Sequence, residues 1–187
     1  MNYKMIVYNI GKILLVEAVL LVLPARVSII YSDGMLASYA VTIAALTVTG
    51  VLATKKKPKN KSIYAKEGYV IVAFTWILMS LVGALPFWLS GGIPNFVDAF
   101  FETVSGFTTT GASILTSQQI ESMPKALMFW RLFTHWIGGM GILVFVLAIM
   151  PANNAGVMHV FRTESPGPSV GKLASKLRFT ARILYGT

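Results

Sequence analysis

The sequence predicts an all-α membrane protein, and three observations carry this prediction. Hydrophobic residues make up 55% of the 187 residues. Charged residues make up only 12%, about half the roughly 25% of average soluble chains. Four apolar runs approach the roughly 20 residues that a membrane-spanning helix needs. An ordinary soluble domain and a disordered chain are thereby excluded, and the absence of Cys excludes a disulfide scaffold, a Cys-ligated zinc site and a thiol nucleophile.

The first two runs, residues 13–30 and 36–53, predict an N-terminal transmembrane helix pair within residues 1–54. Glu17 lies in the first run, where a mid-membrane charge costs about 2.5–3.5 kcal/mol. It therefore needs a partner or a wet cavity, or the helix lies against protein. Pro24 predicts a kink in this helix. A cleaved signal peptide is the competing interpretation, which Glu17 disfavours because it interrupts the apolar stretch.

The basic residues predict the orientation of the chain. The loop at residues 55–67 holds six lysines beside one acid, and the tail at residues 151–187 holds five further basic residues. Cytoplasmic loops carry an excess of Lys and Arg, so the N-terminus, this loop and the C-terminus are expected in the cytoplasm of a multi-pass inner-membrane protein. A nucleic-acid-binding patch is not expected, because no aromatic residues interleave the lysines.

The third and fourth runs, residues 69–89 and 126–150, flank a segment too short to span the bilayer, within a unit at residues 68–150. Its apolar part, residues 98–107, would form a helix of about 15 Å, half the hydrocarbon thickness. Asp98 suits the N-cap or first turn of this helix. Irregular backbone at membrane depth survives only where protein buries it or water wets it, so the segment predicts a re-entrant pore helix and loop.

Thr108, Thr109, Thr110, Gly111 and Ala112 follow that helix and are the candidate ion-binding residues. The C-terminal end of a helix favours a cation. Threonine hydroxyls and backbone carbonyls are oxygen ligands of the kind that replace the hydration shell of K⁺. Gly111 permits a positive φ that would keep a neighbouring carbonyl aimed at the ion. An ordinary polar turn is the alternative.

Three stretches resemble the TrkH type of the Trk/Ktr/HKT potassium-transporter superfamily. They are residues 100–112 (FFETVSGFTTTGA), residues 130–142 with WR and WIGGMGI, and residues 164–185 with ESPGP, KL and TARILY. The family implies four membrane–pore–membrane repeats around one K⁺ pore. The resemblance makes Thr109, Thr110, Gly111 and Ala112 one quarter of the selectivity filter, with K⁺ at Thr109, Thr110 and Gly111 and with Thr108 leading into it.

The resemblance also implies the partners: K⁺ as the transported ion, the lipid bilayer, the remaining pore repeats, a homodimer partner and a cytoplasmic nucleotide-binding regulatory subunit. The sequence holds one pore loop, which matches the N-terminal part of such a subunit up to the start of a second repeat. The alternative is a non-conducting membrane fragment or assembly module. No cofactor is expected, and no enzyme, because the His-Glu-x-x-His pattern is absent and His135 is distant in sequence from the acids Asp98 and Glu102.

Other candidates lie in and beside the fourth run. Gly138, Gly139 and Gly141 are expected to let this helix pack closely against the pore helix, with a flexible bend as the alternative. Arg131 is expected to form an ion pair with Glu102, which lies on the pore helix, or with Glu121, and snorkelling toward the outer interface is the alternative. His135 has no nearby Cys or second His, which favours a packing hydrogen bond over a metal site.

Overall fold

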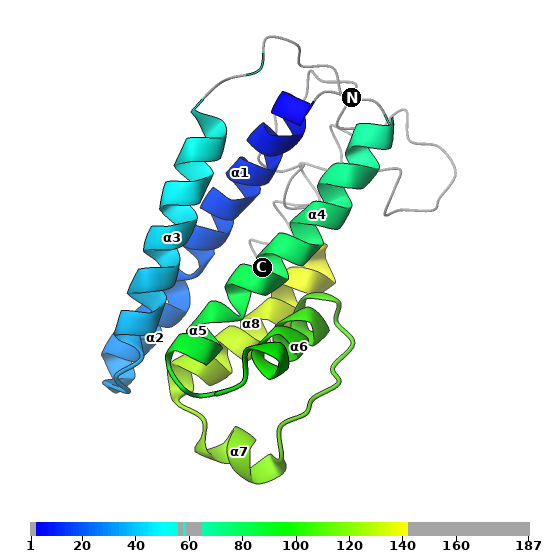
Figure 1. Ribbon diagram of the computed structural model, residues 1–187. Helices are drawn as coiled ribbons and strands as arrows, with labels where there is room; N and C mark the ends of the chain where they lie inside the picture. Colours follow the sequence, from blue (N-terminus) through cyan, green and yellow to red (C-terminus); the bar gives the residue numbers. More distant parts are fainter. Residues whose placement is uncertain (1–2, 56–57, 59–64, 142–187) are drawn as a thin grey trace.

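The computed structural model describes residues 3–55, 58 and 65–141, and these form helices and connecting loops with no strand. Three helical stretches are long and apolar enough to cross a membrane: Tyr3–Tyr31, Leu36–Thr54 and Gly68–Leu89. They correspond to the first three predicted spans, and the predicted all-α membrane fold is confirmed (Figure 1). The tail and the part of the fourth predicted span after residue 141 lie outside the described residues.

The first span consists of two helices, α1 (Tyr3–Leu20) and α2 (Val22–Tyr31). The interruption at Leu21 is the one that Pro24 predicts, because proline has no N–H for the carbonyl four residues earlier and its ring crowds that carbonyl. Hydropathy predicted that the span begins near residue 13, but the helix begins at Tyr3. The first turns mix polar and apolar residues, so they are less hydrophobic than the rest while remaining helical.

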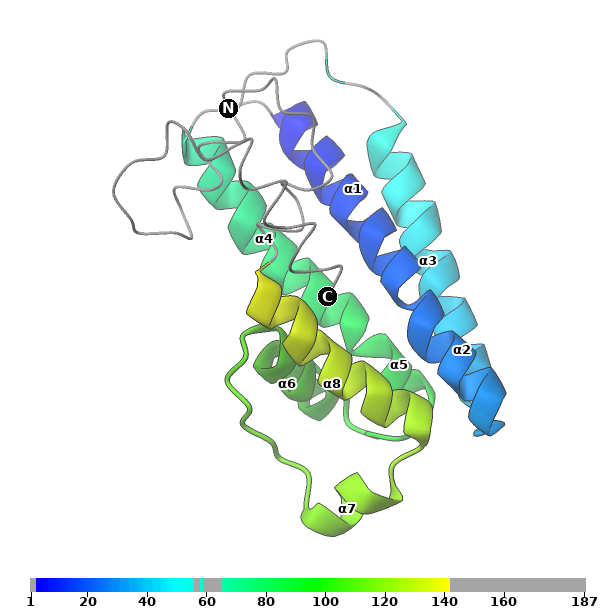
Figure 2. The same ribbon diagram turned by 180° about the vertical axis from the view of Figure 1, so that it is seen from behind.

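Helix α3 (Leu36–Thr54) returns alongside α1 and completes the N-terminal helix pair (Figures 1 and 2). The two helices meet at Gly11 and Gly50. A Cβ at Gly11 would lie 2.6 Å from Ala53 Cβ, and a Cβ at Gly50 would lie 2.7 Å from Leu15 Cγ. Only hydrogen fits at either position, so the pair of glycines sets how closely the two backbones approach.

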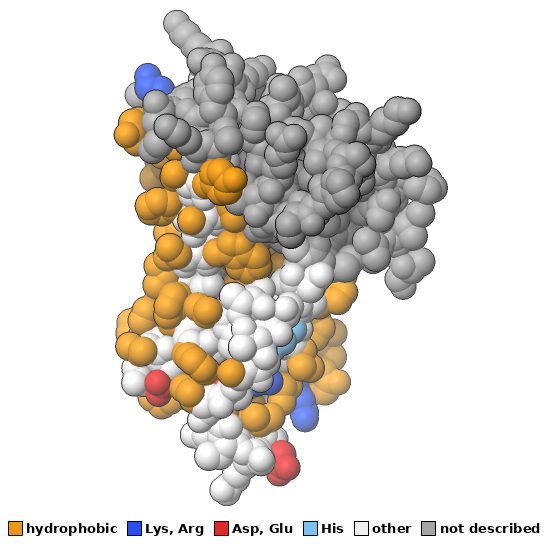
Figure 3. Space-filling model, turned by 90° about the vertical axis from the view of Figure 1, so that its right-hand side faces the viewer, with side chains coloured by type: hydrophobic (Ala, Val, Ile, Leu, Met, Phe, Trp, Pro, Cys, Tyr) orange, Lys and Arg blue, Asp and Glu red, His pale blue; other side chains and the backbone are white. Residues whose placement is uncertain are grey.

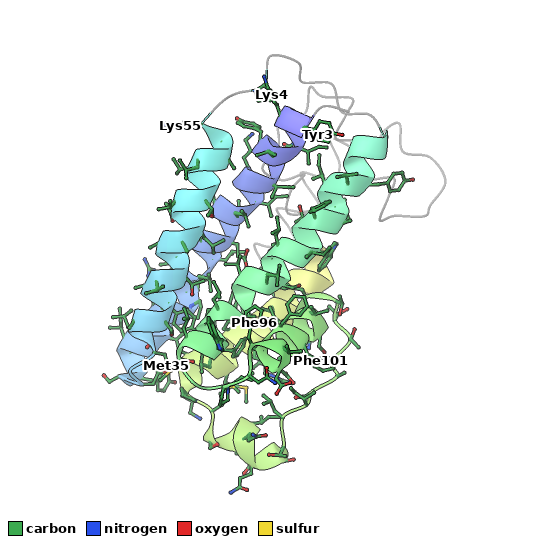
Figure 4. All side chains as sticks on the ribbon, in the orientation of Figure 1. Tyr3, Lys4, Met35, Lys55, Phe96 and Phe101 are labelled. Carbon is green, nitrogen blue, oxygen red and sulfur yellow. The ribbon has the colours of Figure 1, made fainter. Side chains whose placement is uncertain are left out.

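Helix α4 (Ala65–Gly83) starts at the same end of the molecule as α1, and α5 (Leu85–Leu89) continues it to the opposite end (Figure 1). Figure 4 shows these two ends, with Lys4 and Lys55 at one and Met35 at the other. From the Met35 end the chain forms the half-length helix α6 (Phe96–Phe107), the short α7 (Ser117–Ser122) and α8 (Lys125–Met140).

Glu17 lies where α1, α4 and α6 come together. It is fully buried, and neither carboxylate oxygen has a hydrogen-bond partner among the described residues. A Cβ on Gly83 of α4 would lie 3.4 Å from Glu17 Oε1 and 2.9 Å from Thr103 Cγ2 of α6. Of the three expectations for Glu17, the observed one is a helix that lies against protein.

The described helices expose many apolar side chains, as a bilayer-embedded surface requires. Figure 3 shows apolar side chains over much of the visible helical surface, and a paler polar area toward the end that holds α7. On α3, for example, Val41, Val48 and Leu52 are each more than half exposed. Such a surface would be an aggregation liability in water, and it suits contact with lipid or with further membrane helices.

Candidate pore-loop site

Helix α6 sets the position of the candidate loop. It has 12 residues, so it is about 18 Å long and crosses only part of a bilayer. Asn95 is its N-cap, and the Asn95 side chain accepts the Val97 N–H at 3.0 Å. Asp98 therefore lies in the first turn and is not the N-cap. The helix starts two residues earlier than predicted and ends at Phe107, where the prediction placed its end.

Close backbone contacts hold α6 against α8. A Cβ at Gly138 would lie 2.1 Å from the Phe107 carbonyl oxygen, and a Cβ at Gly106 would lie 2.2 Å from Thr134 Oγ1. Position 138 therefore accepts only glycine without a backbone shift, and a side chain at position 106 would displace the Thr134 side chain. Gly139 has open space to 3.9 Å, where Thr109 Cγ2 lies. Gly141 follows the end of α8 with φ +71°, and no described atom lies within 4 Å of its Cβ position.

The loop that follows α6 is exposed from Thr108 to Ile114. Thr109 has φ 55° and Gly111 has φ 75°, whereas Thr108 has φ −82°. Positive φ is rare for a β-branched residue and is found mainly where function or a tight turn requires it. Thr110 is absent from the positive-φ residues, so the sign of φ alternates from residue to residue between Thr108 and Gly111.

This reversal matters for the direction of the carbonyl groups. In an extended L-chain, successive carbonyls point to opposite sides, as the side chains do. The positive φ of Thr109 and Gly111 departs from this extended alternation. Because no described atom lies within 4 Å of the Gly111 Cβ position, the requirement for glycine there comes from φ and not from crowding.

Ser105 ties the loop to α6. Its carbonyl accepts the Thr110 N–H at 3.0 Å, and its hydroxyl donates to the Ala112 carbonyl at 2.6 Å. The Thr108 and Thr110 hydroxyl oxygens lie 2.8 Å apart. These bonds restrict the loop to one path before it leaves for α7.

Glu102 holds the far side of the loop. Its Oε1 accepts the Ser113 hydroxyl at 2.6 Å and the Ile114 N–H at 2.8 Å, and its Oε2 lies 3.0 Å from Arg131 Nε. Glu102 is 2% exposed. Of the two carboxylates considered for Arg131, the structure pairs it with Glu102. One buried carboxylate thus connects the pore helix, the loop and α8.

Two residues of this site, Ser105 and Ser113, were not singled out from the sequence. Ser105 and Ser113 gave no signal beyond being polar. Trp130 is fully buried, and its indole N–H donates to the Gly83 carbonyl at 2.8 Å, which ties α8 to α4. His135 Nδ1 lies 3.0 Å from the Arg131 carbonyl oxygen. No group of three or more His, Cys, Asp or Glu side chains that could hold a metal occurs in the described part of the chain.

Comparison with known proteins places this geometry in a family. The TrkH family, described as "cation transport protein", matches residues 35–186, well over half of the chain. The chain belongs to the TrkH family. The predicted resemblance to TrkH-type subunits is therefore confirmed.

Named relatives agree with this assignment. The chain is 35% identical over 188 residues to the Trk system potassium uptake protein TrkH of Halomonas elongata, a match that covers 99% of this chain and 39% of that protein. It is 35% identical to the Escherichia coli K12 protein of the same name, covering 99% and 38%. The crystal structure of the potassium transporter TrkH from Vibrio parahaemolyticus superposes with a TM-score of 0.76 at 28% identity, over 97% of this chain and 37% of that chain. The chain thus spans about two-fifths of the length of these relatives.

Proposed function

We propose that this TrkH-family chain takes part in K⁺ transport across the membrane, as the N-terminal helix pair and first pore repeat of a K⁺-translocating subunit. In this proposal Thr109, Thr110, Gly111 and Ala112 supply one quarter of the selectivity filter, and Thr108 leads into it. K⁺ binds at Thr109, Thr110 and Gly111, mainly through backbone carbonyl oxygens. Three further repeats supply the remaining ligands.

The observation that carries the proposal is the loop after α6. It follows a half-length helix, it has positive φ at Thr109 and Gly111, and Glu102 and Ser105 hold it from behind. Thr108–Ala112 are exposed in the single chain. A quarter of a pore has this property, because its ligands face an axis that the other three quarters complete. The relatives named as potassium uptake proteins support K⁺ as the ion.

The proposal includes a location and an orientation. The protein is a multi-pass protein of the cell inner membrane, with its N-terminus, the lysine loop and its C-terminus in the cytoplasm. The turn at Asp33 and the short helix α7 then lie on the outer side. The pore helix enters from outside, and its C-terminal end, at Phe107, points its dipole at the ion.

Partners complete the proposal. One chain with one pore loop cannot enclose an ion path, so the remaining pore repeats are required. The family resemblance adds a homodimer partner and a cytoplasmic nucleotide-binding regulatory subunit. The other candidate function is a non-conducting membrane module that only assembles with partners. The observation that favours it is that the chain matches only about two-fifths of the relatives' length.

A complementation experiment separates the two candidates. The complete reading frame that contains this sequence is expressed in cells that lack their own K⁺ uptake. Growth at low K⁺ and uptake of ⁸⁶Rb⁺, inhibited by K⁺ and not by Na⁺, support the proposal. A protein that reaches the membrane and gives neither growth nor uptake supports the non-conducting module and refutes K⁺ transport.

The Gly111→Ser variant tests the filter assignment in the same cells. A side chain at φ 75° adds about 1–2 kcal/mol of backbone strain, which is expected to shift the loop carbonyls from their ion-binding positions. We expect the ratio of K⁺ to Na⁺ uptake to fall or uptake to be lost. Gly91→Ser is the matched control, because Gly91 has φ +74° and an equally open Cβ position outside the loop. Unchanged selectivity in Gly111→Ser would remove the filter from this loop.

A further inference from the structure

The start of α8 is held by residues of the N-terminal helix pair. Pro124 occupies the N-cap position of α8 and makes no side-chain cap hydrogen bond. In its place, Asp33, in the turn between α2 and α3, accepts the Ala126 N–H through Oδ2 at 2.9 Å. An N-cap aspartate satisfies a free N–H of the first helical turn and favours its positive end. Asp33 does this for α8 from 93 residues away in the sequence.

Tyr39 of α3 holds the other backbone group of the same residue. Its hydroxyl donates to the Ala126 carbonyl at 2.9 Å, and Tyr39 has no exposed surface. Asp33 is itself fixed, since Oδ1 accepts the Ser28 hydroxyl and the Met35 N–H. We call Asp33 and Tyr39, with Ala126 between them, the Asp33–Tyr39 clamp.

We propose that the Asp33–Tyr39 clamp makes the N-terminal helix pair a positioning element for the pore loop, so that Asp33 and Tyr39 act as positioning residues for ion selectivity. This inference rests on the proposed function, because selectivity is its readout. The helix pair contributes no residue to the loop. In this proposal it nevertheless sets the position of α8, the helix whose Arg131 pairs with Glu102 behind the loop.

The path from the clamp to the loop runs through α8. Ala126 and Arg131 are five residues apart, about 7.5 Å along the helix axis. Arg131 Nε lies 3.0 Å from Glu102 Oε2, and Oε1 of the same carboxylate holds the Ser113 hydroxyl and the Ile114 N–H. A shift of the start of α8 therefore moves Arg131 relative to Glu102, which bonds to the loop directly.

Other contacts keep α8 folded when the clamp is removed. The Trp130 indole donates to the Gly83 carbonyl, and farther along the helix Gly138 lies against the Phe107 backbone. Loss of the clamp is thus expected to let the start of α8, as far as Arg131, shift without releasing the whole helix. The clamp can for this reason be tested in a folded protein.

Three variants in the complete protein test the clamp. Asp33→Ala removes all three bonds to the carboxylate, and Tyr39→Phe removes a single hydroxyl from a buried ring. Asp33→Asn keeps one oxygen for the Ala126 N–H, so it is expected to restore most of the function. Glu121→Gln is the matched control, because it removes an exposed acid of α7 that has no hydrogen bond in the described part of the chain.

Two measurements are made on each variant: the ratio of K⁺ to Na⁺ uptake, and hydrogen exchange of the backbone amides at residues 125–131. We expect Asp33→Ala and Tyr39→Phe to lower the uptake ratio about fivefold or more, the lower end of typical coupling between sites. Faster exchange is expected in the first turn of α8, while Asp33→Asn and Glu121→Gln stay close to the parent protein.

The outcomes separate the clamp from the proposed function. If the parent protein transports no K⁺, the proposed function fails, and hydrogen exchange alone decides whether the clamp holds α8. If the parent is selective and both Asp33→Ala and Tyr39→Phe remain equally selective, the positioning role is overturned, even where their thermal stability falls. If Asp33→Ala does not accumulate in the membrane, Tyr39→Phe decides by the same criterion. An Asp33→Asn variant as defective as Asp33→Ala overturns the capping role.

Discussion

Replacing Arg131 by Met removes one partner of the ion pair that connects α8 to the pore helix. Glu102 is 2% exposed, so its carboxylate would then remain buried with only the Ser113 and Ile114 donors. Removing one partner of a buried pair costs about 3–5 kcal/mol, because the other charge is left uncompensated. At roughly 2–4 °C per kcal/mol, the midpoint of thermal unfolding should fall on the order of 10 °C.

Replacing Glu102 by Gln in the same protein separates the charge from the hydrogen bonds. The Gln amide oxygen still accepts the Ser113 and Ile114 donors, so the cost should be smaller than for Arg131→Met. In the double variant no buried charge is left unpaired. The sum of the two single effects should therefore exceed the effect of the double variant by about 0.5–3 kcal/mol.

The assay is thermal unfolding of the complete protein in detergent, with ⁸⁶Rb⁺ uptake measured on the same preparations. Arg26→Met is the control, because Arg26 is exposed on α2 and forms no ion pair with a described residue. Strictly additive effects of Arg131→Met and Glu102→Gln would refute the coupling. An Arg131→Met midpoint equal to that of Arg26→Met would show that the pair contributes nothing to holding α8 on α6.

Three further predictions follow from other contacts. Gly11→Leu should separate α1 from α3, because the leucine Cβ alone would lie 2.6 Å from Ala53 Cβ. Thermal unfolding should show that the free energy of unfolding falls by several kcal/mol. A variant as stable as the parent would contradict the close approach of the two helices. Glu17→Met should raise the unfolding midpoint, since a buried group without partners, as Glu17 is among the described residues, costs about 1–3 kcal/mol. A lowered midpoint would show that Glu17 has a stabilising partner. Burial raises the pKa of Asp33, but hydrogen bonds from Ser28 and from the Ala126 and Met35 N–H groups outweigh it, so the pKa lies below its ordinary value of 3.8. The stability that the ionised form contributes is then present above pH 3.8 and lost as the pH falls through the lowered folded pKa, a dependence that should be absent in Asp33→Asn when unfolding is followed against pH.

Hydropathy and helix length were sufficient to predict much of the fold. The second span was predicted at residues 36–53 and forms α3 at Leu36–Thr54. The short pore helix was also found, because an apolar run too short to span the bilayer is visible in the sequence. The start of α1 was missed, since a hydropathy run measures where the chain becomes apolar and not where the helix begins. The helix α7 was also missed, although Thr116 and Gln119 form a capping box that the sequence displays.

Contacts between distant segments could not be read from the sequence. Arg131 needed a carboxylate, but only the packing of α8 on α6 decides between Glu102 and Glu121. The Asp33 bond to Ala126 joins segments whose proximity depends on the whole helix arrangement. The positive φ of Gly111 was anticipated from its residue type, whereas that of Thr109 was not, because threonine rarely adopts it.

The central claim is that the loop after α6 binds K⁺ through its backbone carbonyls. Its most direct test is a crystal structure of the complete protein with Rb⁺ in place of K⁺, since the anomalous signal of Rb⁺ locates the ion without reference to any transport assay. We expect an anomalous peak beside the carbonyl oxygens of Thr109 and Thr110, which disappears in Gly111→Ser. A peak elsewhere in the pore with none at this loop, or an unchanged peak in Gly111→Ser, would contradict it.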